Sequence, residues 1–121
     1  MELSFYDARG SPTAYCEDGR ILYSFNGTPL AYLDGDSVYG FKGGHLGWWS
    51  RGWVIDHQGS WVFSTELAAG GPPLPRRRAS AVKRYKKLPP APAAKHMKPV
   101  PTTGGLGWSS RSGPQFFEGA H

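Results

Sequence analysis

The sequence predicts an all-β protein made of four β-hairpin repeats about a pseudo-fourfold axis, followed by a disordered basic C-terminal extension. Glycines recur at positions 10, 27, 43 and 59, with spacings of 17, 16 and 16 residues. Short apolar runs rich in Tyr, Val, Ile and Leu flank each of them, as in β-strands. Gly and Pro together account for 28 of the 121 residues, which excludes a helical bundle.

Each repeat is predicted to be one hairpin, because its glycine lies between two strand-like runs. Asn26-Gly27 is the clearest turn, since both residues tolerate positive φ and suit a type I′ turn. A second glycine series, at positions 19, 35 and 52, marks the joints between repeats. The eight short strands leave no room for a helix in this region.

A two-residue turn at each repeat glycine fixes an expected register. One face then pairs a large apolar residue with a very small one in three repeats: Phe5 with Ala14, Leu22 with Ala31 and Val38 with Gly47, while the fourth pair is Val54 with Phe63. The other face pairs Tyr6 with Thr13, Tyr23 with Leu30, Tyr39 with Leu46 and Ile55 with Val62. A small residue recurring at one position predicts close backbone approach near a shared axis.

Five stretches carry a resemblance to a known family: FYDARGSP (5–12), NGTPLAYLDGDSVYGF (26–41), HLGWW (45–49), WSS (108–110) and SGPQFF (112–117). They resemble the small bacterial 4-fold beta flower proteins. The resemblance covers residues 3–73 and 105–119. It implies four hairpins about a pseudo-fourfold axis and brings no catalytic residue with it.

Charge divides the chain into unlike parts. Residues 1–71, the predicted four-hairpin module, hold four Lys/Arg against eight Asp/Glu, a net charge of −4. Residues 72–121 hold ten Lys/Arg against one Glu, a net of +9. Residues 72–103 are mainly Pro, Ala, Lys and Arg, so we expect a disordered linker with too little apolar surface to fold.

The C-terminal segment, residues 104–121, is predicted to dock on the module. Its three large aromatic residues, Trp108, Phe116 and Phe117, are unusual for a disordered end. The linker is long enough for docking on the same chain or on a neighbouring copy. The alternative is an exposed peptide that binds another protein.

The leading functional hypothesis is a non-enzymatic interaction module or assembly subunit that binds through an aromatic β surface. Its partner would be an unknown protein or a second copy of the chain, since Tyr and Trp form binding hot spots. The alternative is that these rings fill the core of a small domain. The candidate residues are Tyr15, Tyr32, Trp48, Trp49, Trp53 and Trp61.

Weak nucleic-acid association through the basic linker is the second hypothesis. Clustered cations neutralise phosphates without folded structure, and Tyr85 could stack on a base. A solvated tail that improves solubility explains the same residues. The candidate contacts are Arg76, Arg77, Arg78, Lys83, Arg84, Lys86 and Lys87.

Enzymatic, metal and membrane functions receive little support. His45 and His57 show no recognised ligand spacing, so no metal or other cofactor is expected. A cryptic hydrolase would need Cys16 beside one of these histidines, and a small buried role is favoured for this cysteine. The single cysteine, the absence of a long apolar stretch and the lack of a signal-peptide pattern favour a cytoplasmic protein without membrane contact.

Overall fold

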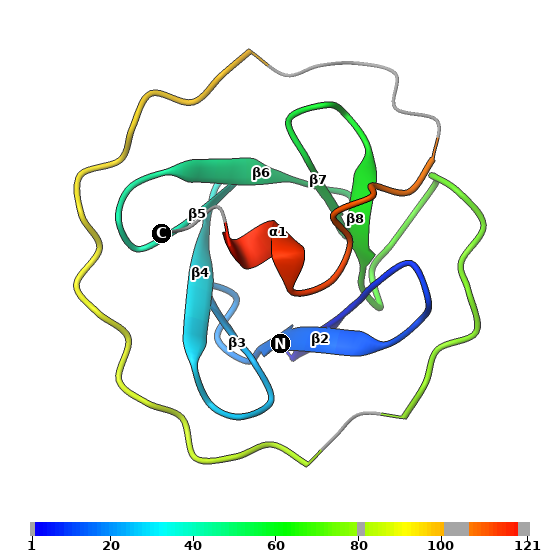
Figure 1. Cartoon of the computed structure of the whole chain (residues 1–121), viewed down its shortest axis with the longest axis horizontal. Coiled ribbons are helices and arrows are strands. Elements are labelled where there is room, and N and C mark those ends of the chain that lie inside the picture. The colour runs from blue at the N-terminus through cyan, green and yellow to red at the C-terminus, as the bar shows by residue number, and fades with distance from the viewer. Residues whose placement is uncertain (1, 80–81, 101–106, 119–121) are drawn as a thin grey trace.

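A computed structural model describes residues 2–79, 82–100 and 107–118, and it contains eight antiparallel strands closed into a barrel in chain order (Figure 1). The strands are β1 (Leu3–Tyr6), β2 (Pro12–Cys16), β3 (Ile21–Tyr23), β4 (Pro29–Asp34), β5 (Ser37–Tyr39), β6 (His45–Ser50), β7 (Trp53–Ile55) and β8 (Trp61–Ser64). A four-residue helix, α1 (Gln115–Glu118), lies over one end of the barrel. No helix in the described segments is long and apolar enough to cross a bilayer.

The fold prediction is confirmed, because hairpins β1–β2, β3–β4, β5–β6 and β7–β8 are arranged around one axis. The predicted interior pairs are present in all four: Phe5 with Ala14, Leu22 with Ala31, Val38 with Gly47 and Val54 with Phe63. Ala14 and Ala31 are fully buried. A Cβ added at Gly47 would overlap the carbonyl of Ile55. Crowding at the axis therefore explains the small residues.

The predicted two-residue turns at the repeat glycines are wrong. In the first hairpin the amide of Gly10 donates to the carbonyl of Asp7 at 2.9 Å, which closes a four-residue turn. A bulge follows, so Tyr6 faces Pro12 instead of Thr13. The same shift recurs in the other three hairpins: Tyr23 faces Pro29, Tyr39 faces His45 and Ile55 faces Trp61.

The type I′ geometry predicted at Asn26-Gly27 occurs at a joint instead. Gly27 has a φ of +92°, but Asn26 has no positive φ, as expected of a glycine bulge after an ordinary turn. At the joint between β6 and β7, Arg51 and Gly52 both have positive φ, 50° and 81°. Two-residue turns therefore connect β4 with β5 and β6 with β7, while bulged turns form the tips of the hairpins.

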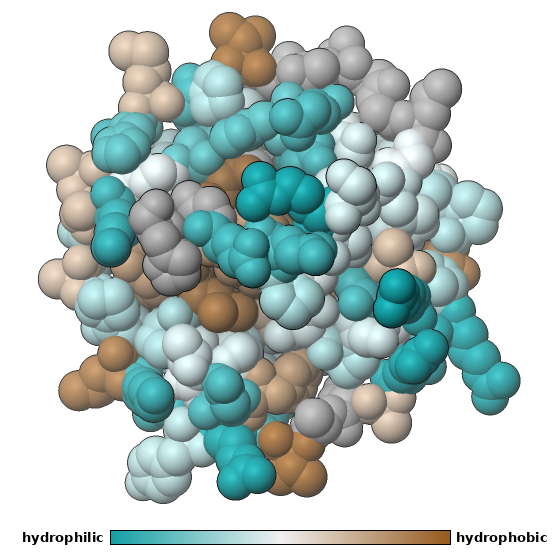
Figure 2. Space-filling model, in the orientation of Figure 1, coloured by the Kyte–Doolittle hydropathy of each residue, from teal (hydrophilic) through white to brown (hydrophobic). Residues whose placement is uncertain are grey.

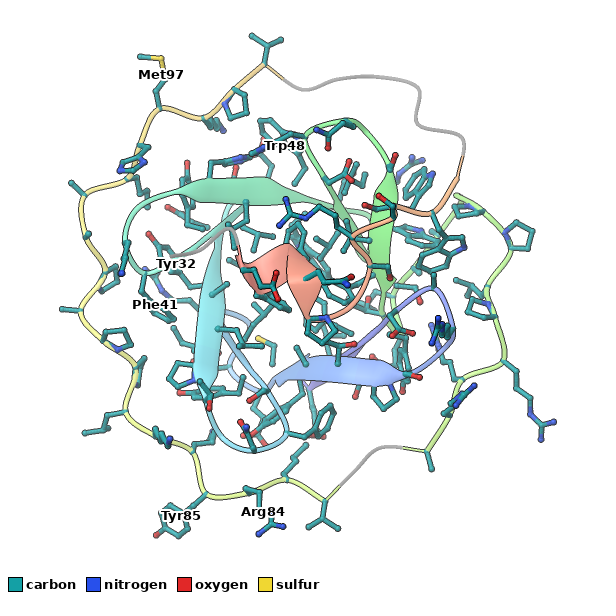
Figure 3. All side chains as sticks on the ribbon, in the orientation of Figure 1. Tyr32, Phe41, Trp48, Arg84, Tyr85 and Met97 are labelled. Carbon is teal, nitrogen blue, oxygen red and sulfur yellow. The ribbon has the colours of Figure 1, made fainter. Side chains whose placement is uncertain are left out.

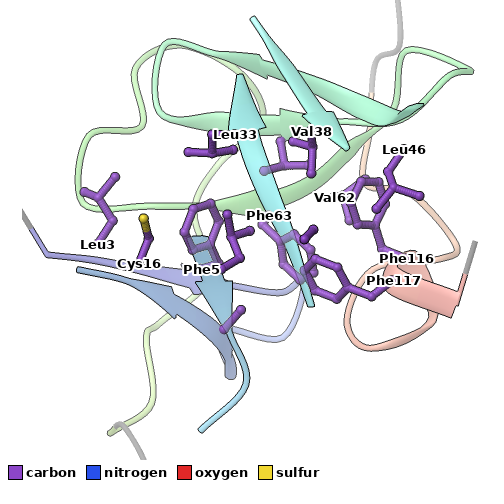
Figure 4. Packing of buried hydrophobic residues seen from close by; sticks show 14 residues of the cluster. Leu3, Phe5, Cys16, Leu33, Val38, Leu46, Val62, Phe63, Phe116 and Phe117 are labelled. Atoms are coloured by element: carbon purple, nitrogen blue, oxygen red, sulfur yellow. The ribbon is translucent and has the colours of Figure 1, made fainter. Parts of the chain in front are cut away.

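Aromatic packing joins the C-terminal segment to the barrel core. Phe116 and Phe117, both buried, belong to the core cluster that fills the barrel (Figure 4). The ring centroid of Phe63 lies 5.7 Å from that of Phe116 and 5.5 Å from that of Phe117. Trp108 packs on the side of the barrel, where its ring centroid lies 5.4 Å from that of Trp53.

The basic extension encircles the barrel. Residues 72–79 and 82–100, here called the belt, contain no helix or strand, in keeping with the expected lack of secondary structure. The sequence predicts disorder for them, yet they follow the outer surface of the barrel through the whole described length (Figure 1). Large apolar side chains of the belt stand out singly along the rim of the molecule (Figure 2). The belt therefore holds the barrel without contributing apolar side chains to its core.

Candidate interaction surface: the barrel wall and its belt

The outer side of the barrel carries a series of aromatic rings, here called the wall: Tyr6, Tyr15, Tyr23, Tyr32, Tyr39 and Trp48. They face outward because strand side chains alternate, and the residues next to them fill the interior. Rings from successive hairpins stack: the centroids of Tyr15 and Tyr23 are 5.9 Å apart, and those of Tyr32 and Tyr39 are 5.8 Å apart. All six rings are buried although they lie outside the barrel. A belt cation lies over five of them, and Arg20 of the barrel lies over Tyr32.

Cations of the belt meet the wall at a regular interval of nine residues. The three cation–ring pairs are Arg77 over Tyr6 at 4.7 Å, Lys86 over Tyr23 at 5.1 Å and Lys95 over Tyr39 at 5.7 Å from the ring centroid. Lys83 over Tyr15 and Lys98 over Trp48 add two more, at 4.5 and 5.8 Å. Such contacts are electrostatic attractions between a cation and the face of a ring.

The backbone of the belt repeats at the same interval. The amides of Arg78, Lys87 and His96 donate to the carbonyls of Gly10, Gly27 and Gly43 at 2.8, 2.9 and 2.8 Å. At each of these glycines an added Cβ would overlap a belt carbonyl, that of Arg76, Tyr85 or Ala94. The tip glycines therefore serve two purposes, since they adopt positive φ and also allow the belt to approach closely.

Ion pairs bring the basic belt and the acidic barrel together. Lys86 donates to Glu17 at 2.6 Å, and Lys98 pairs with Asp36 at 2.9 Å. Lys95 pairs with Asp34, and Lys83 pairs with Glu2 and Glu17. Hydrogen bonds from Lys95 and Lys98 hold the pKa of Asp34 and of Asp36, respectively, below the usual value. The belt thus neutralises part of the acidic charge of the barrel within one chain, and a net charge of +5 remains.

The six aromatic residues predicted to form a binding surface do not lie together on an open face. Tyr15, Tyr32 and Trp48 belong to the wall and are buried. Belt lysines lie over Tyr15 and Trp48, whereas Arg20 of the barrel lies over Tyr32. Trp53 is fully buried against Trp61 and Trp108. Trp49 turns inward and packs on Phe5, with 5.7 Å between ring centroids. The six residues therefore form no single open surface in this conformation, and their role in binding stays a prediction.

The seven cations predicted to contact anions fall into two groups. Arg77, Lys83 and Lys86 turn toward the wall, where they contact rings, and Arg77 also donates to the carbonyl of Thr65 at 2.6 Å. The other group lies along the exposed belt, and Arg84 and Tyr85 in it point away from the barrel (Figure 3). This second group is Arg76, Arg78, Arg84 and Lys87.

His45 and His57 lie in one chain of hydrogen bonds that runs to the belt. His45 Nδ1 is 2.9 Å from His57 Nε2, and His45 Nε2 is 3.0 Å from Ser37 Oγ. Ser37 donates its own proton to Asp36, so His45 Nε2–H must donate to Ser37, and Nδ1 must accept from His57. Burial, reinforced by the charge of His57, lowers the pKa of His45 to about 4. The chain ends at the ion pair of Asp36 with Lys98.

Cys16 lies in the core, as the sequence favours, and its Sγ is 3.7 Å from Asp18 Oδ1. Burial, followed by the charge of Asp18, raises the pKa of the thiol above its usual value. The two histidines form a hydrogen bond with each other rather than with this thiol. The described residues contain no cluster of three or more His, Cys, Asp or Glu side chains suited to a metal ion.

A model of the 4-fold beta flower family matches residues 3–117. The chain belongs to this family. The match spans the four hairpins of the flower and the belt, and it ends within α1. Neither the comparison with curated proteins nor that with solved structures gave a match.

The most regular part of the flower's surface is missing from the sequence-based candidates. Tyr6, Tyr23 and Tyr39, which receive the evenly spaced cations, are absent from them. Asp34 and Asp36, whose carboxylates pair with belt lysines, are absent from them as well. One signal was available in the sequence: positions 77, 86 and 95 are all basic and nine residues apart.

Proposed function

We propose that this protein is a non-enzymatic interaction module whose aromatic wall binds extended, basic polypeptide segments. The observation that carries the proposal is the way the belt lies on the wall. It is held by cations over rings and by backbone hydrogen bonds, which is how a bound peptide ligand is held. In this proposal the belt is an intramolecular occupant of a peptide-binding surface.

The character of the contacts supports a reversible occupant. The ion pairs of the belt are between partly exposed side chains, which makes each of them weak and sensitive to salt. Four buried donors of the barrel have no hydrogen-bond partner among the described residues: the Tyr32 hydroxyl, Trp48 Nε1, Trp53 Nε1 and the Ser64 hydroxyl. A different segment could satisfy donors that the belt leaves unpaired.

A direct test opens the wall in the full-length chain. Lys86→Glu, Lys95→Glu and Lys98→Glu together replace attraction by repulsion between the belt and Glu17, Asp34 and Asp36. A fluorescent peptide with the sequence of residues 74–100 is then titrated onto this variant, and anisotropy is measured. We expect saturable binding. In 0.5 M NaCl the Kd of the peptide should rise by about 2 decades if four or five ion pairs are lost.

The matched control peptide has the same composition but a shuffled order, so that its cations are no longer nine residues apart. It should bind at least about tenfold more weakly, because fewer cations reach rings at once. Equal binding of the two peptides would show that only net charge matters. Absence of binding by both would refute the proposal.

Nucleic-acid association remains a second candidate, favoured by the outward direction of Arg84 and Tyr85 (Figure 3). Cations beside an exposed aromatic ring suit a flexible single strand. Arg76, Arg78, Arg84 and Lys87 replaced by Ser should abolish a salt-dependent mobility shift of single-stranded DNA, whereas the wall variant above should keep part of it. A shift that survives the serine variant would contradict this candidate. A cytoplasmic location, expected from the sequence, belongs to both proposals.

A further inference from the structure

We propose that two copies of this chain exchange their C-terminal portions, so that the segment after Gly71 of one copy lies on the barrel of the other. The inference rests on the proposed function, because it names the partner that supplies the extended basic segment. The exchanged segment contains the belt and α1, which both contact the barrel and are continuous in the chain.

The nine-residue spacing identifies the partner. A segment that fills the wall must place a cation on the rings of three successive hairpins, and it must also place an amide on each tip carbonyl. An unrelated basic segment has its cations at other intervals and cannot meet these positions together. A second copy of this chain brings the same three cations, at residues 77, 86 and 95, separated by two intervals of nine residues.

A hinge lies where the belt leaves the barrel. The chain is anchored as far as Ala69, whose amide donates to the carbonyl of Arg51 at 3.0 Å. Gly70 and Gly71 follow with positive φ, +71° and +78°, and then come Pro72 and Pro73. Two glycines in this conformation permit a change of direction that few other residues could make, and the prolines keep the next part extended. Opening this hinge redirects the segment without altering the barrel strands.

The contacts permit exchange because they are the same in both arrangements, so exchange costs no contact energy. Belt residues with large apolar side chains point to solvent: Val82, Leu88 and Met97 are 86, 94 and 95% exposed. No apolar core of the belt therefore has to be rebuilt. The single-chain arrangement is favoured only by the local concentration of the attached belt, in the millimolar range for a flexible link. Phe116 and Phe117 must leave the core, so exchange is expected when chains refold together at high concentration.

The test uses two full-length variants with complementary charges. Variant A carries Lys86→Glu, Lys95→Glu and Lys98→Glu; variant B carries Glu17→Lys, Asp34→Lys and Asp36→Lys. Each repels its own belt, but exchange in a mixed pair places opposite charges together on both walls. Refolded together at about 1 mM, which is the range of local concentrations above, A and B should form a dimer by light scattering. Each refolded alone should remain a monomer.

The control replaces A by a variant with Arg78→Glu, Arg84→Glu and Lys87→Glu, which makes the same change of charge at exposed side chains outside the cation–ring pairs and ion pairs described above. It should give no dimer with B. A mixture of folded A and B that stays monomeric would overturn the exchange. If the peptide of residues 74–100 still binds A in that case, the proposed function stands and only the identity of the partner fails.

A second experiment avoids the charge changes. Lys86 Nζ lies 2.6 Å from Glu17 Oε1, so a Glu17→Cys chain and a Lys86→Cys chain are refolded together and treated with a short bismaleimide. Exchange predicts a covalent dimer of the two chains, and neither chain alone should yield it in comparable amount. A product confined to monomers in the mixture would also refute the exchange.

Discussion

The barrel and the belt are both periodic, but their periods rest on different physics. The barrel repeats every 16 or 17 residues, and its interior is apolar, closely packed and almost fully buried. The belt repeats every nine residues, and its contacts are cations over rings, ion pairs and backbone hydrogen bonds at the surface. Burial makes the barrel stable, whereas the exposed polar contacts of the belt give it a position that salt and mutation can change.

The largest loss of stability is expected when the C-terminal segment is removed from the barrel. A chain ending after residue 103 lacks Phe116 and Phe117, and burial of two such rings contributes about 3–6 kcal/mol. The melting temperature should fall, and tryptophan emission should shift to the red because Trp53 loses Trp108. A chain ending after residue 118 keeps all three rings and serves as control. If the chain that ends after residue 103 keeps the melting temperature and tryptophan emission of the full chain, the C-terminal segment does not stabilise the barrel.

The next largest loss of stability is expected from a single substitution in the core. Phe63 is fully buried and contacts Phe5, Phe116 and Phe117, so Phe63→Ala should lower the free energy of unfolding by about 3–5 kcal/mol in urea titrations. Tyr85→Ala, at a belt ring that is 97% exposed, is the matched control and should change little. Similar losses for the two variants would erase the distinction between core and belt.

Acid should weaken the barrel through His45. Its pKa is about 4 in the folded chain and 6.5 when unperturbed, so the unfolded chain binds more protons between these values. The free energy of unfolding should therefore fall as pH decreases from about 6.5 to about 4, by about 1–2 kcal/mol. His45→Gln should remove this part of the pH dependence. Below that window, protonation of Asp34 and Asp36 removes the ion pairs with the belt, because their pKa values are lowered in the folded state.

The smallest effect is expected from a substitution that disturbs only the contact of the belt with one hairpin tip. Gly43→Ala and Gly35→Ala both place a Cβ on a residue with positive φ, but only at Gly43 would it overlap a belt carbonyl, that of Ala94. Both should lose about 1 kcal/mol from backbone strain. Gly43→Ala should also lose hydrogen-exchange protection at the amide of His96. Equal protection of that amide in the two variants would mean that the belt is not held at this tip.

The fold was largely predictable because barrel and sequence share one period. Glycine spacing located the hairpins, and the alternation of large and small residues identified the axis-facing pairs, such as Phe5 with Ala14. The turn geometry was not predictable in the same way. Asn26-Gly27 favours a type I′ turn locally, but each tip adopts a four-residue turn with a bulge, which lets the belt lie against the glycine.

For the candidate site, the sequence predicted some of the residues but not their arrangement. Alternation within each strand places Tyr15, Tyr32 and Trp48 on one face, yet whether that face is open depends on where residues 72–100 go. The linker has too little apolar surface to fold alone, so composition favours disorder. Its partners are rings and carboxylates that lie from 50 to 81 residues earlier in the chain, as with Lys98 and Trp48 or Lys83 and Glu2.

By itself, the amino-acid sequence determined the repeat, the strands and the inward-facing residues, because these depend on local spacing and on hydrophobic burial. Only the tertiary structure decided that the basic extension surrounds the barrel and that Phe116 and Phe117 complete its core. Contacts between distant segments require the closed barrel, since closure is what places the aromatic rings and tip glycines at intervals that a nine-residue step can follow.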